Sequence, residues 1–344
     1  MKGRLIIAGA LAAALPTLPA AARAQGPECS GQDIAVQDAC QKAVDMFQFM
    51  APQLGTSIAG GNAVLGTGGN LGSIGHLSVG LRFNAIKGTI PDFREGFPVA
   101  AGNASNTQPL PTRSFALGAP AAEVAVSVFP GVPLGLTRLG GVDAIVSANY
   151  IPNLSGKNWE LSVDNPLKLG FGARLGVLKE GLVFPGLAVS YLRRDLPTAT
   201  FASVSSRSGG TDSISLSELK VRTSAWRLTA SKSLLVVGLT LGVGRDSYDM
   251  DTHVDAVTRP TSPTTVAALC ATGSCRIGTD MGAKTDRMNY FADVSFNLPI
   301  LKIVGEIGQV SGGDLKTFNT FDDAKVNGSR LYGSVGLRVG FPPF

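Results

Sequence analysis

The feature that most constrains the fold of this chain is an alternation of apolar and polar residues that returns many times along it. In residues 167–177 every second residue is apolar, and Lys168, Arg174 and three glycines lie between. Successive side chains of a β-strand point to opposite faces, so the pattern predicts one apolar and one polar face. A period of two is incompatible with an amphipathic helix over these residues.

About ten stretches share this pattern. They are residues 77–85, 123–128, 142–150, 167–177, 187–191, 219–230, 237–243, 288–296, 301–307 and 331–341. In the sixth stretch the alternation changes phase once, which indicates a β-bulge. The stretches approach the ~9 to 11 residues that a tilted strand needs to cross a bilayer.

The connections between these stretches supply a second criterion, because they alternate in length. Long polar connections span residues 87–113, 151–165, 195–216, 248–284 and 312–329, and short ones span 130–140, 179–181, 231–233 and 297–299. Long loops outside and short turns inside are typical of transmembrane β-barrels. We therefore predict an all-β, antiparallel up-and-down transmembrane β-barrel of about 10 strands (range 10–14) over residues 76–344, with both termini in the periplasm. A soluble β-sandwich remains the alternative, since packing on a second sheet also gives alternation.

Residues 1–24 have the pattern of a cleaved signal peptide. Lys2 and Arg4 precede a short apolar run, and Ala22-Arg23-Ala24 has the small-x-small form of a cleavage site. The apolar run is shorter than the ~20 residues of a membrane-spanning helix. We expect export and, for a barrel, localisation in the cell outer membrane.

Residues 25–75 differ from the rest of the chain. In residues 33–54 apolar side chains recur at three- and four-residue spacing, which predicts an amphipathic helix, and Pro52 limits its end. Residues 55–75 are rich in glycine and small polar residues and read as a flexible connector. The helix either plugs the lumen or packs beneath the barrel in the periplasm, and its apolar stripe favours contact with the barrel.

The four cysteines form two close pairs, Cys29 with Cys40 and Cys270 with Cys275. Behind a signal peptide, two local disulfides are the expected state, with free thiols as the alternative. Neither pair has the second, spaced pair of ligands that a zinc site requires. We expect no metal and no cofactor.

Nine charged residues fall on the polar faces of the predicted strands, where a barrel would turn them into its lumen. They are Arg82, Glu123, Asp143, Lys168, Arg174, Asp293, Lys302, Glu306 and Arg338. Unlike charges can pair there. The net charge of +5 is not gathered into a run, so a nucleic-acid partner is not expected.

Candidates for catalysis are few, because the chain has two histidines. His253 lies between Asp251 and Asp255 in the longest predicted outer loop, which leaves a surface hydrolase as one hypothesis. A solvated loop residue is the plainer interpretation. No nucleophile motif accompanies this histidine, so we do not expect an enzyme.

From residue 77 onward the sequence resembles Gram-negative outer-membrane β-barrel proteins, and the aromatic Phe341 and Phe344 resemble the terminal signal read by the barrel-assembly machinery. The N-terminal helix and glycine-rich segment resemble the hatch-bearing long-chain fatty acid transporter family. The Asn-Pro-Ala hatch motif of that family is missing here, and its barrel has more strands, so no binding residues are transferred.

A barrel of about ten strands is filled largely by its own side chains, which argues against a wide porin. The sequence thus predicts a narrow channel or transporter for small or hydrophobic solutes, with outer-membrane lipid and the assembly machinery as partners. The alternatives are a non-conducting structural or adhesion barrel that acts through its long outer loops, and the surface hydrolase.

Overall fold

The computed structural model describes residues 27–30, 34–93, 104, 106–135, 137–205, 212–259, 274–322 and 324–341. The predicted signal peptide, Cys270 and Phe344 lie outside the described residues.

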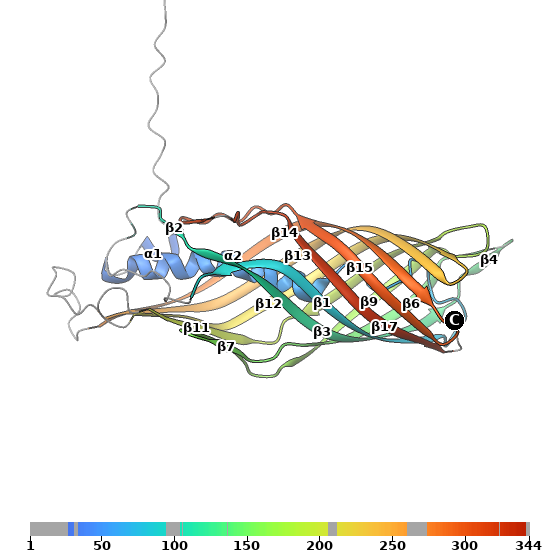
Figure 1. Ribbon diagram of the computed structural model, residues 1–344, viewed down its shortest axis with the longest axis horizontal. Helices are drawn as coiled ribbons and strands as arrows, with labels where there is room; N and C mark the ends of the chain where they lie inside the picture. Colours follow the sequence, from blue (N-terminus) through green and yellow to red (C-terminus); the bar gives the residue numbers. More distant parts are fainter. Residues whose placement is uncertain are drawn as a thin grey trace, which may run out of the picture.

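Ten antiparallel strands of the described chain close into a barrel (Figure 1). They are β1 (Leu77–Pro91), β3 (Thr112–Phe129), β6 (Gly141–Tyr150), β9 (Leu167–Leu178), β10 (Gly186–Asp195), β12 (Asp212–Leu234), β13 (Val237–Thr258), β14 (Cys275–Asn297), β15 (Leu301–Ser311) and β17 (Arg330–Phe341). Each strand pairs with the next of this series, and β17 pairs with β1 and closes the ring. The predicted fold class and strand number are confirmed, and each predicted stretch lies on one of these strands.

Seven shorter strands lie within the connections. They are β2 (Pro109–Leu110), β4 (Val132–Leu134), β5 (Thr137–Leu139), β7 (Leu154–Gly156), β8 (Trp159–Val163), β11 (Ala199–Ser205) and β16 (Thr320–Phe321). Strands β7, β8 and β11 add to the wall beside β12, whereas β16 pairs with β2 in a separate parallel ladder.

The two ends of the barrel differ. At the inner end β1 begins opposite the end of β17, with Leu77 paired to Phe341, and four short connections span residues 130–140, 179–185, 235–236 and 298–300. At the outer end lie the long connections (left in Figure 1). The predicted loop 248–284 is wrong in extent, because β13 continues to Thr258 and β14 begins at Cys275.

The N-terminal segment lies inside the barrel. It forms α1 (Pro27–Ser30), a 3₁₀ turn, η1 (Ile34–Val36), and α2 (Gln37–Ala59), which runs from the outer end toward the middle (Figure 1). Of the 23 residues of α2, 20 are buried, so the helix is enclosed on all sides instead of presenting one apolar stripe. Pro52 does not end the helix as predicted; Gly60, with a φ of 62°, follows its last residue.

The wall has two halves with opposite chemistry. In the inner half of β12, β13 and β14, the outward side chains are apolar, among them Leu228, Leu241 and Val294, and the inward ones are polar. In the outer half the inward side chains are apolar, among them Val221 and Met250, and pack around α2. The strands of 22 and 23 residues are about twice as long as a membrane crossing requires. The inner half is therefore the membrane-spanning half, and the outer half projects beyond it.

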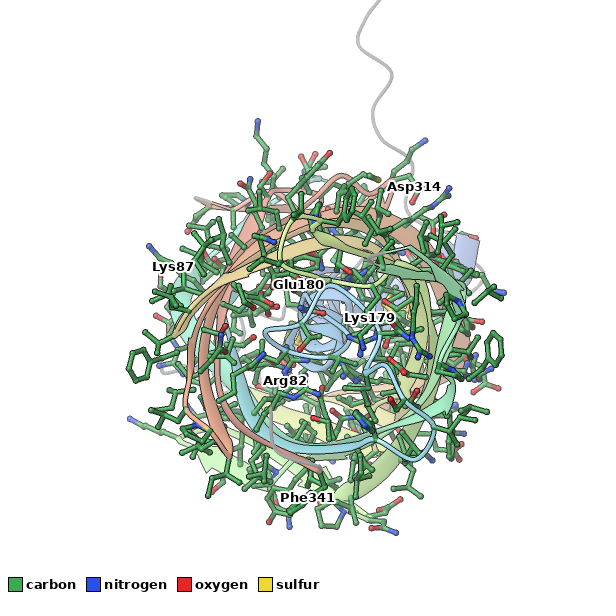
Figure 2. All side chains as sticks on the ribbon, turned by 90° about the vertical axis from the view of Figure 1, so that its right-hand side faces the viewer. Arg82, Lys87, Lys179, Glu180, Asp314 and Phe341 are labelled. Atoms are coloured by element: carbon green, nitrogen blue, oxygen red, sulfur yellow. A yellow bond between two sulfur atoms is a disulfide. The ribbon has the colours of Figure 1, made fainter. Side chains whose placement is uncertain are left out.

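The outward apolar belt of the inner half continues around the whole ring. It includes Leu81, Phe83, Val146, Tyr150, Leu169, Phe171, Leu175, Trp226, Leu228, Leu239, Leu241, Tyr290, Val294, Phe296, Ile303, Ile307, Val335, Leu337 and Phe341. A view into the inner end shows Phe341 pointing outward and Arg82 pointing into the lumen (Figure 2). A belt of this kind is what lipid-facing strands require.

Candidate functional site

The lumen of the inner half is filled by residues 60–72, which we call the plug segment. The sequence suggested a flexible connector here, but all except two of these residues are buried. The segment has no regular secondary structure, so its backbone N–H and C=O groups need partners from elsewhere. The wall of the barrel supplies them.

Wall arginines donate to the carbonyl groups at the end of α2 and the start of the plug segment. Arg194 donates to Ile58 and Ala59 at 3.3 and 2.5 Å. Arg227 donates to Gly60 and Gly61 at 2.9 and 2.7 Å. These carbonyls are the ones that a helix end leaves without intrahelical partners, and the guanidinium groups satisfy them.

The next residues are held through both kinds of backbone group by a cluster of unlike charges. Arg82 donates to the carbonyl of Asn62 at 2.9 Å and pairs with Glu123 at 2.8 Å. Glu306 accepts from the N–H groups of Gly61 and Asn62 at 3.2 and 2.7 Å. Arg194 also pairs with Glu123, so two arginines balance the two carboxylates of this cluster.

Further toward the inner end, Asp293 accepts from the N–H of Gly66 at 3.0 Å. Asp143 accepts from the N–H of Leu71 at 3.1 Å and is paired with Arg174 at 2.8 Å. The remaining wall donors and the carbonyls they meet are Arg338 to Leu65 at 2.8 Å, Lys302 to Gly66 at 3.3 Å, Arg174 to Thr67 at 3.3 Å, Thr229 to Gly68 at 3.1 Å and Ser127 to Gly72 at 3.4 Å.

Eight of the nine charged residues that the sequence placed in the lumen are buried there: Arg82, Glu123, Asp143, Arg174, Asp293, Lys302, Glu306 and Arg338. Lys168 is the exception. It shares the inward parity of β9 but lies near the outer end of that strand and is exposed. These charges line no water-filled channel in this state, because most of them bind the plug segment.

Sequence reasoning missed Arg194, Arg227, Asp246 and Asn289, all buried in the same network. Arg194 follows Arg193, so the parity of the pair was ambiguous. Arg227 lies in the stretch where the alternation changes phase. Val221 and Thr223 face inward, and counting on by two residues along the strand would have predicted that Arg227 also faces inward.

Glycines allow the plug segment to approach the wall closely. A Cβ at Gly68 would lie 2.6 Å from the backbone nitrogen of Ser231. A Cβ at Gly61 would lie 2.5 Å from the hydroxyl of Tyr332. The glycine content of this segment thus reflects packing against backbone and side chains, beyond any need for flexibility.

An apolar cavity of about 60 Å³ lies in the outer half, between α2 and the wall. Its lining includes Phe47, Ala51 and Leu54 from α2 and Leu117, Trp159 and Phe201 from the wall. Trp159 and Phe201 are stacked, with ring centroids 6.1 Å apart. Gln53 is the one polar side chain of the lining, and both ends of its amide are bonded to the backbone of Thr89. The lining is thus apolar apart from this amide and the indole N–H of Trp159.

The outer end of α2 is fastened to the connection between β15 and β17. Asp45 accepts from the N–H groups of Phe318 and Asn319 at 2.9 and 2.8 Å, and burial raises its pKa despite these donors. The rings of Phe49 and Phe321 stack with centroids 4.0 Å apart. This connection therefore packs along α2 and holds the helix in the outer half of the barrel.

The disulfide between Cys29 and Cys40 joins α1 to α2, as the sequence predicted, and both residues are fully buried. Cys275, the first residue of β14, is also disulfide-bonded. Its predicted partner Cys270 lies outside the described residues.

His253 lies on β13 and not in a loop. It faces outward in the outer half, where its Nδ1 lies 2.6 Å from Asp280. Neighbouring outward residues form further ion pairs, among them Arg222 with Asp249 at 3.1 Å. Within the described part of the chain, no hydroxyl or thiol group is hydrogen-bonded to the imidazole. The outward face around His253 is therefore a surface of ion pairs between neighbouring strands.

In the described residues, no helix is long and apolar enough to cross a membrane, and no cluster of three or more His, Cys, Asp or Glu side chains has the geometry of a metal site.

No protein-family model and no curated protein sequence matches the chain. Among solved structures, the chain is similar to the Pseudomonas putida toluene transporter TodX, with 12% identity, a TM-score of 0.34 and coverage of 81% of this chain and 97% of that one. It is also similar to Ail, the attachment invasion locus protein of Yersinia pestis, with 8% identity, a TM-score of 0.28 and coverage of 78% and 99%. A third structure is the β domain of the Bordetella autotransporter BrkA, with 9% identity, a TM-score of 0.28 and coverage of 76% and 98%. These are all outer-membrane β-barrels, and at this level the likeness concerns barrel architecture alone.

Proposed function

We propose that the protein is an outer-membrane barrel that takes up small hydrophobic solutes, with its lumen closed at rest by the plug segment. The observation that carries this proposal is the apolar cavity between α2 and the outer half of the wall. A transporter for polar solutes would need polar groups along its binding site, and the lining of this cavity is apolar apart from Gln53, which is bonded to Thr89, and the indole N–H of Trp159.

A lateral route reaches this cavity. In the described chain, residues 112–120 of β3 pair with β1 only, because pairing with β6 starts at Ala121. Strand β7 pairs with β8 only. A seam in the wall therefore separates β3 from β7, and Leu117 and Leu154, which line the cavity, lie on its two sides. A solute can approach the cavity through this seam, from the side of the barrel.

Binding is coupled to the position of α2. A volume of about 60 Å³ is well below the ~150 Å³ of an apolar cavity that admits benzene. A ring-sized solute must therefore displace α2, which contributes Phe47, Ala51 and Leu54 to the lining. Because α2 continues directly into the plug segment at Gly60, this displacement pulls on the contacts that close the lumen.

The test is naphthalene binding to the detergent-solubilised protein, read by fluorescence. The chain has two tryptophans, so Trp226→Phe leaves Trp159 in the cavity wall as the sole reporter. Saturable quenching of Trp159 is expected. Ala51→Leu in this background fills the cavity and should abolish the quenching. Ala292→Leu, which adds the same volume on an outward position of β14, should leave it unchanged. Quenching that Ala51→Leu does not affect would contradict the proposal.

The filled lumen favours a second candidate, a non-conducting barrel that acts through its outer half. Uptake separates the two candidates. Cells that produce the protein should take up naphthalene faster than cells that do not, and Ala51→Leu should remove the difference. Intact binding with no gain in uptake would favour the non-conducting barrel.

A further inference from the structure

The chain passes through the whole barrel before its first wall strand begins. Thr258, at the outer end of β13, donates to the carbonyl of Ala35 at 3.4 Å. At the other end, the N–H of Gly75 donates to the carbonyl of Ser127 at 3.0 Å, two residues before β1 begins. We expected both termini at the inner end. Instead, the residues before α2 lie at the end opposite Phe341 (Figure 1).

Most hydrogen bonds between the wall and residues 58–72 go to the backbone of that segment, whereas its Ala63 and Val64 side chains pack in a small apolar cluster with the wall. In the part of the chain that the structure describes, wall side chains donate to ten carbonyl groups of residues 58–72 and accept from four of their N–H groups. One side chain of the segment, Asn62, donates a hydrogen bond to Asp293 at 2.6 Å. The bound chain turns at Gly60, Gly66 and Gly72, which have positive φ, so these wall groups recognise the backbone of an irregular, turn-containing polypeptide.

Glycine positions supply what selectivity remains. Gly68 lies so close to the wall that a Cβ would meet backbone atoms of Ser231 and Ala230 at 2.6 and 2.8 Å. A Cβ on the neighbouring Gly69 would meet its nearest atom at 3.5 Å, which is ordinary contact. The site therefore requires glycine at the first position and tolerates a Cβ at the second.

The N-terminal segment before β1 is joined covalently to the wall at one place. Its disulfide, Cys29 to Cys40, lies within the segment itself. Its connection to β1 passes through residues 73–75, which are exposed at the inner end. Cutting the chain there would leave the N-terminal segment bound by non-covalent contacts alone, as a separate ligand would be.

We propose that the lumen is a binding site for a glycine-rich polypeptide in an irregular, turn-containing conformation, and that residues 58–72 occupy it so that the barrel presents the segment before α2 at the cell surface. The long-loop end of such barrels faces outward, and this is the end where α1 lies. This proposal goes beyond solute uptake, because the ligand of the lumen is a polypeptide and the result is exposure of the segment before α2 at the cell surface.

Cleavage at the exposed corner tests the binding site. A protease recognition sequence is inserted between Ser73 and Ile74 of the full chain, and the folded protein is cut in detergent. The N-terminal fragment should stay bound through gel filtration and separate only on boiling. Loss of the fragment without boiling would overturn the proposal.

Three substitutions test recognition of the backbone. Gly68→Ala should speed dissociation of the cut fragment about tenfold, equivalent to about 1.4 kcal/mol. Gly69→Ala should leave the rate unchanged. Thr229→Val, which removes the hydroxyl bonded to the Gly68 carbonyl, should raise the rate about fivefold and serves if Gly68→Ala does not fold. Equal rates for all variants that fold would show that the wall does not read the backbone.

Antibody labelling of intact cells tests the display. An epitope tag placed just before Pro27 should be labelled without permeabilisation. The same tag between Leu182 and Val183, exposed in the turn between β9 and β10 at the inner end, should be labelled only after permeabilisation. A Pro27 tag that needs permeabilisation would overturn the display topology.

Discussion

The inner and outer halves of the barrel are built from the same strands and the same parity of side chains, yet their chemistry is inverted. On β13, Leu239 and Leu241 point outward in the inner half, and Tyr248 and Met250 point inward in the outer half. The difference shows that apolar residues follow the apolar environment. That environment is lipid outside the inner half and the packed helix α2 inside the outer half.

The inversion also assigns different roles to charge in the two halves. In the inner half, charges are buried in the lumen and hold the backbone of the plug segment. In the outer half, they are paired on an exposed surface. The first two predictions compare a position in one environment with a position in the other, and the third tests the anchor of α2 in the outer half.

The largest effect is expected for the lumen ion pair of Arg227 and Asp246, which are 2.6 Å apart and fully buried. Arg227→Met leaves Asp246 buried without its cation and should lower the free energy of unfolding by about 3–5 kcal/mol. Arg245→Met breaks the exposed pair with Asp286 and should cost less than about 1 kcal/mol. Guanidinium unfolding in detergent measures both, and equal losses would contradict the contrast.

A charge on the lipid-facing surface should have the next largest effect. Leu241→Arg places a guanidinium against hydrocarbon and should cost about 2–4 kcal/mol. Asp280→Arg places the same group on the outward surface of the outer half, where Asp280 is already solvated. This variant should assemble like the wild type. Gel migration with and without boiling measures the folded fraction of each variant. Impaired assembly of Asp280→Arg would show that the membrane extends further over the outer half than this account places it.

Asp45 should give the smallest effect of the three. Asp45→Asn loses an acceptor for the N–H groups of Phe318 and Asn319 and should cost about 1–3 kcal/mol. Burial raises the pKa of Asp45 in the folded protein above its ordinary value of 3.8. The stability that the protonated carboxyl provides is therefore complete below pH 3.8 and is lost as the pH rises through the pKa of the folded protein. The difference in unfolding free energy between wild type and Asp45→Asn should therefore narrow as the pH rises above 3.8. A difference that widens would contradict this sign.

The sequence predicted the inner half well. Lipid on one side of the wall and a polar lumen on the other require apolar and polar residues to alternate with a period of two, and this pattern is visible in a single sequence. The outer half escaped prediction for a physical reason. Residues 248–258 and 275–284 have polar outward faces, so they read as loops, although Tyr248, Met250, Ile277 and Met281 alternate on the inward face. The change of phase in the sixth stretch was read as a bulge. A bulge does occur nearby, between Ser217 and Lys220, but the change of phase marks the boundary between the two environments.

The candidate site could be predicted only in part. The charges of the lumen followed from parity, whereas their partners did not, since nothing in a glycine-rich segment specifies which wall groups will meet its backbone. Pro52 suggested a helix end because it lacks an N–H, and the barrel overrode that local preference by enclosing α2 on every side.

The most direct test of the two-environment barrel uses the two tryptophans in bilayers of brominated lipid. Trp226 points outward at the boundary of the inner half and packs against Tyr191, whereas Trp159 lies in the outer half beside the cavity. In a Trp159→Phe protein, bromines near the head-group end of the acyl chains should quench Trp226. In a Trp226→Phe protein, the same lipids should leave Trp159 unquenched. Quenching of both tryptophans would place the outer half in the membrane and contradict the account, as would quenching of neither.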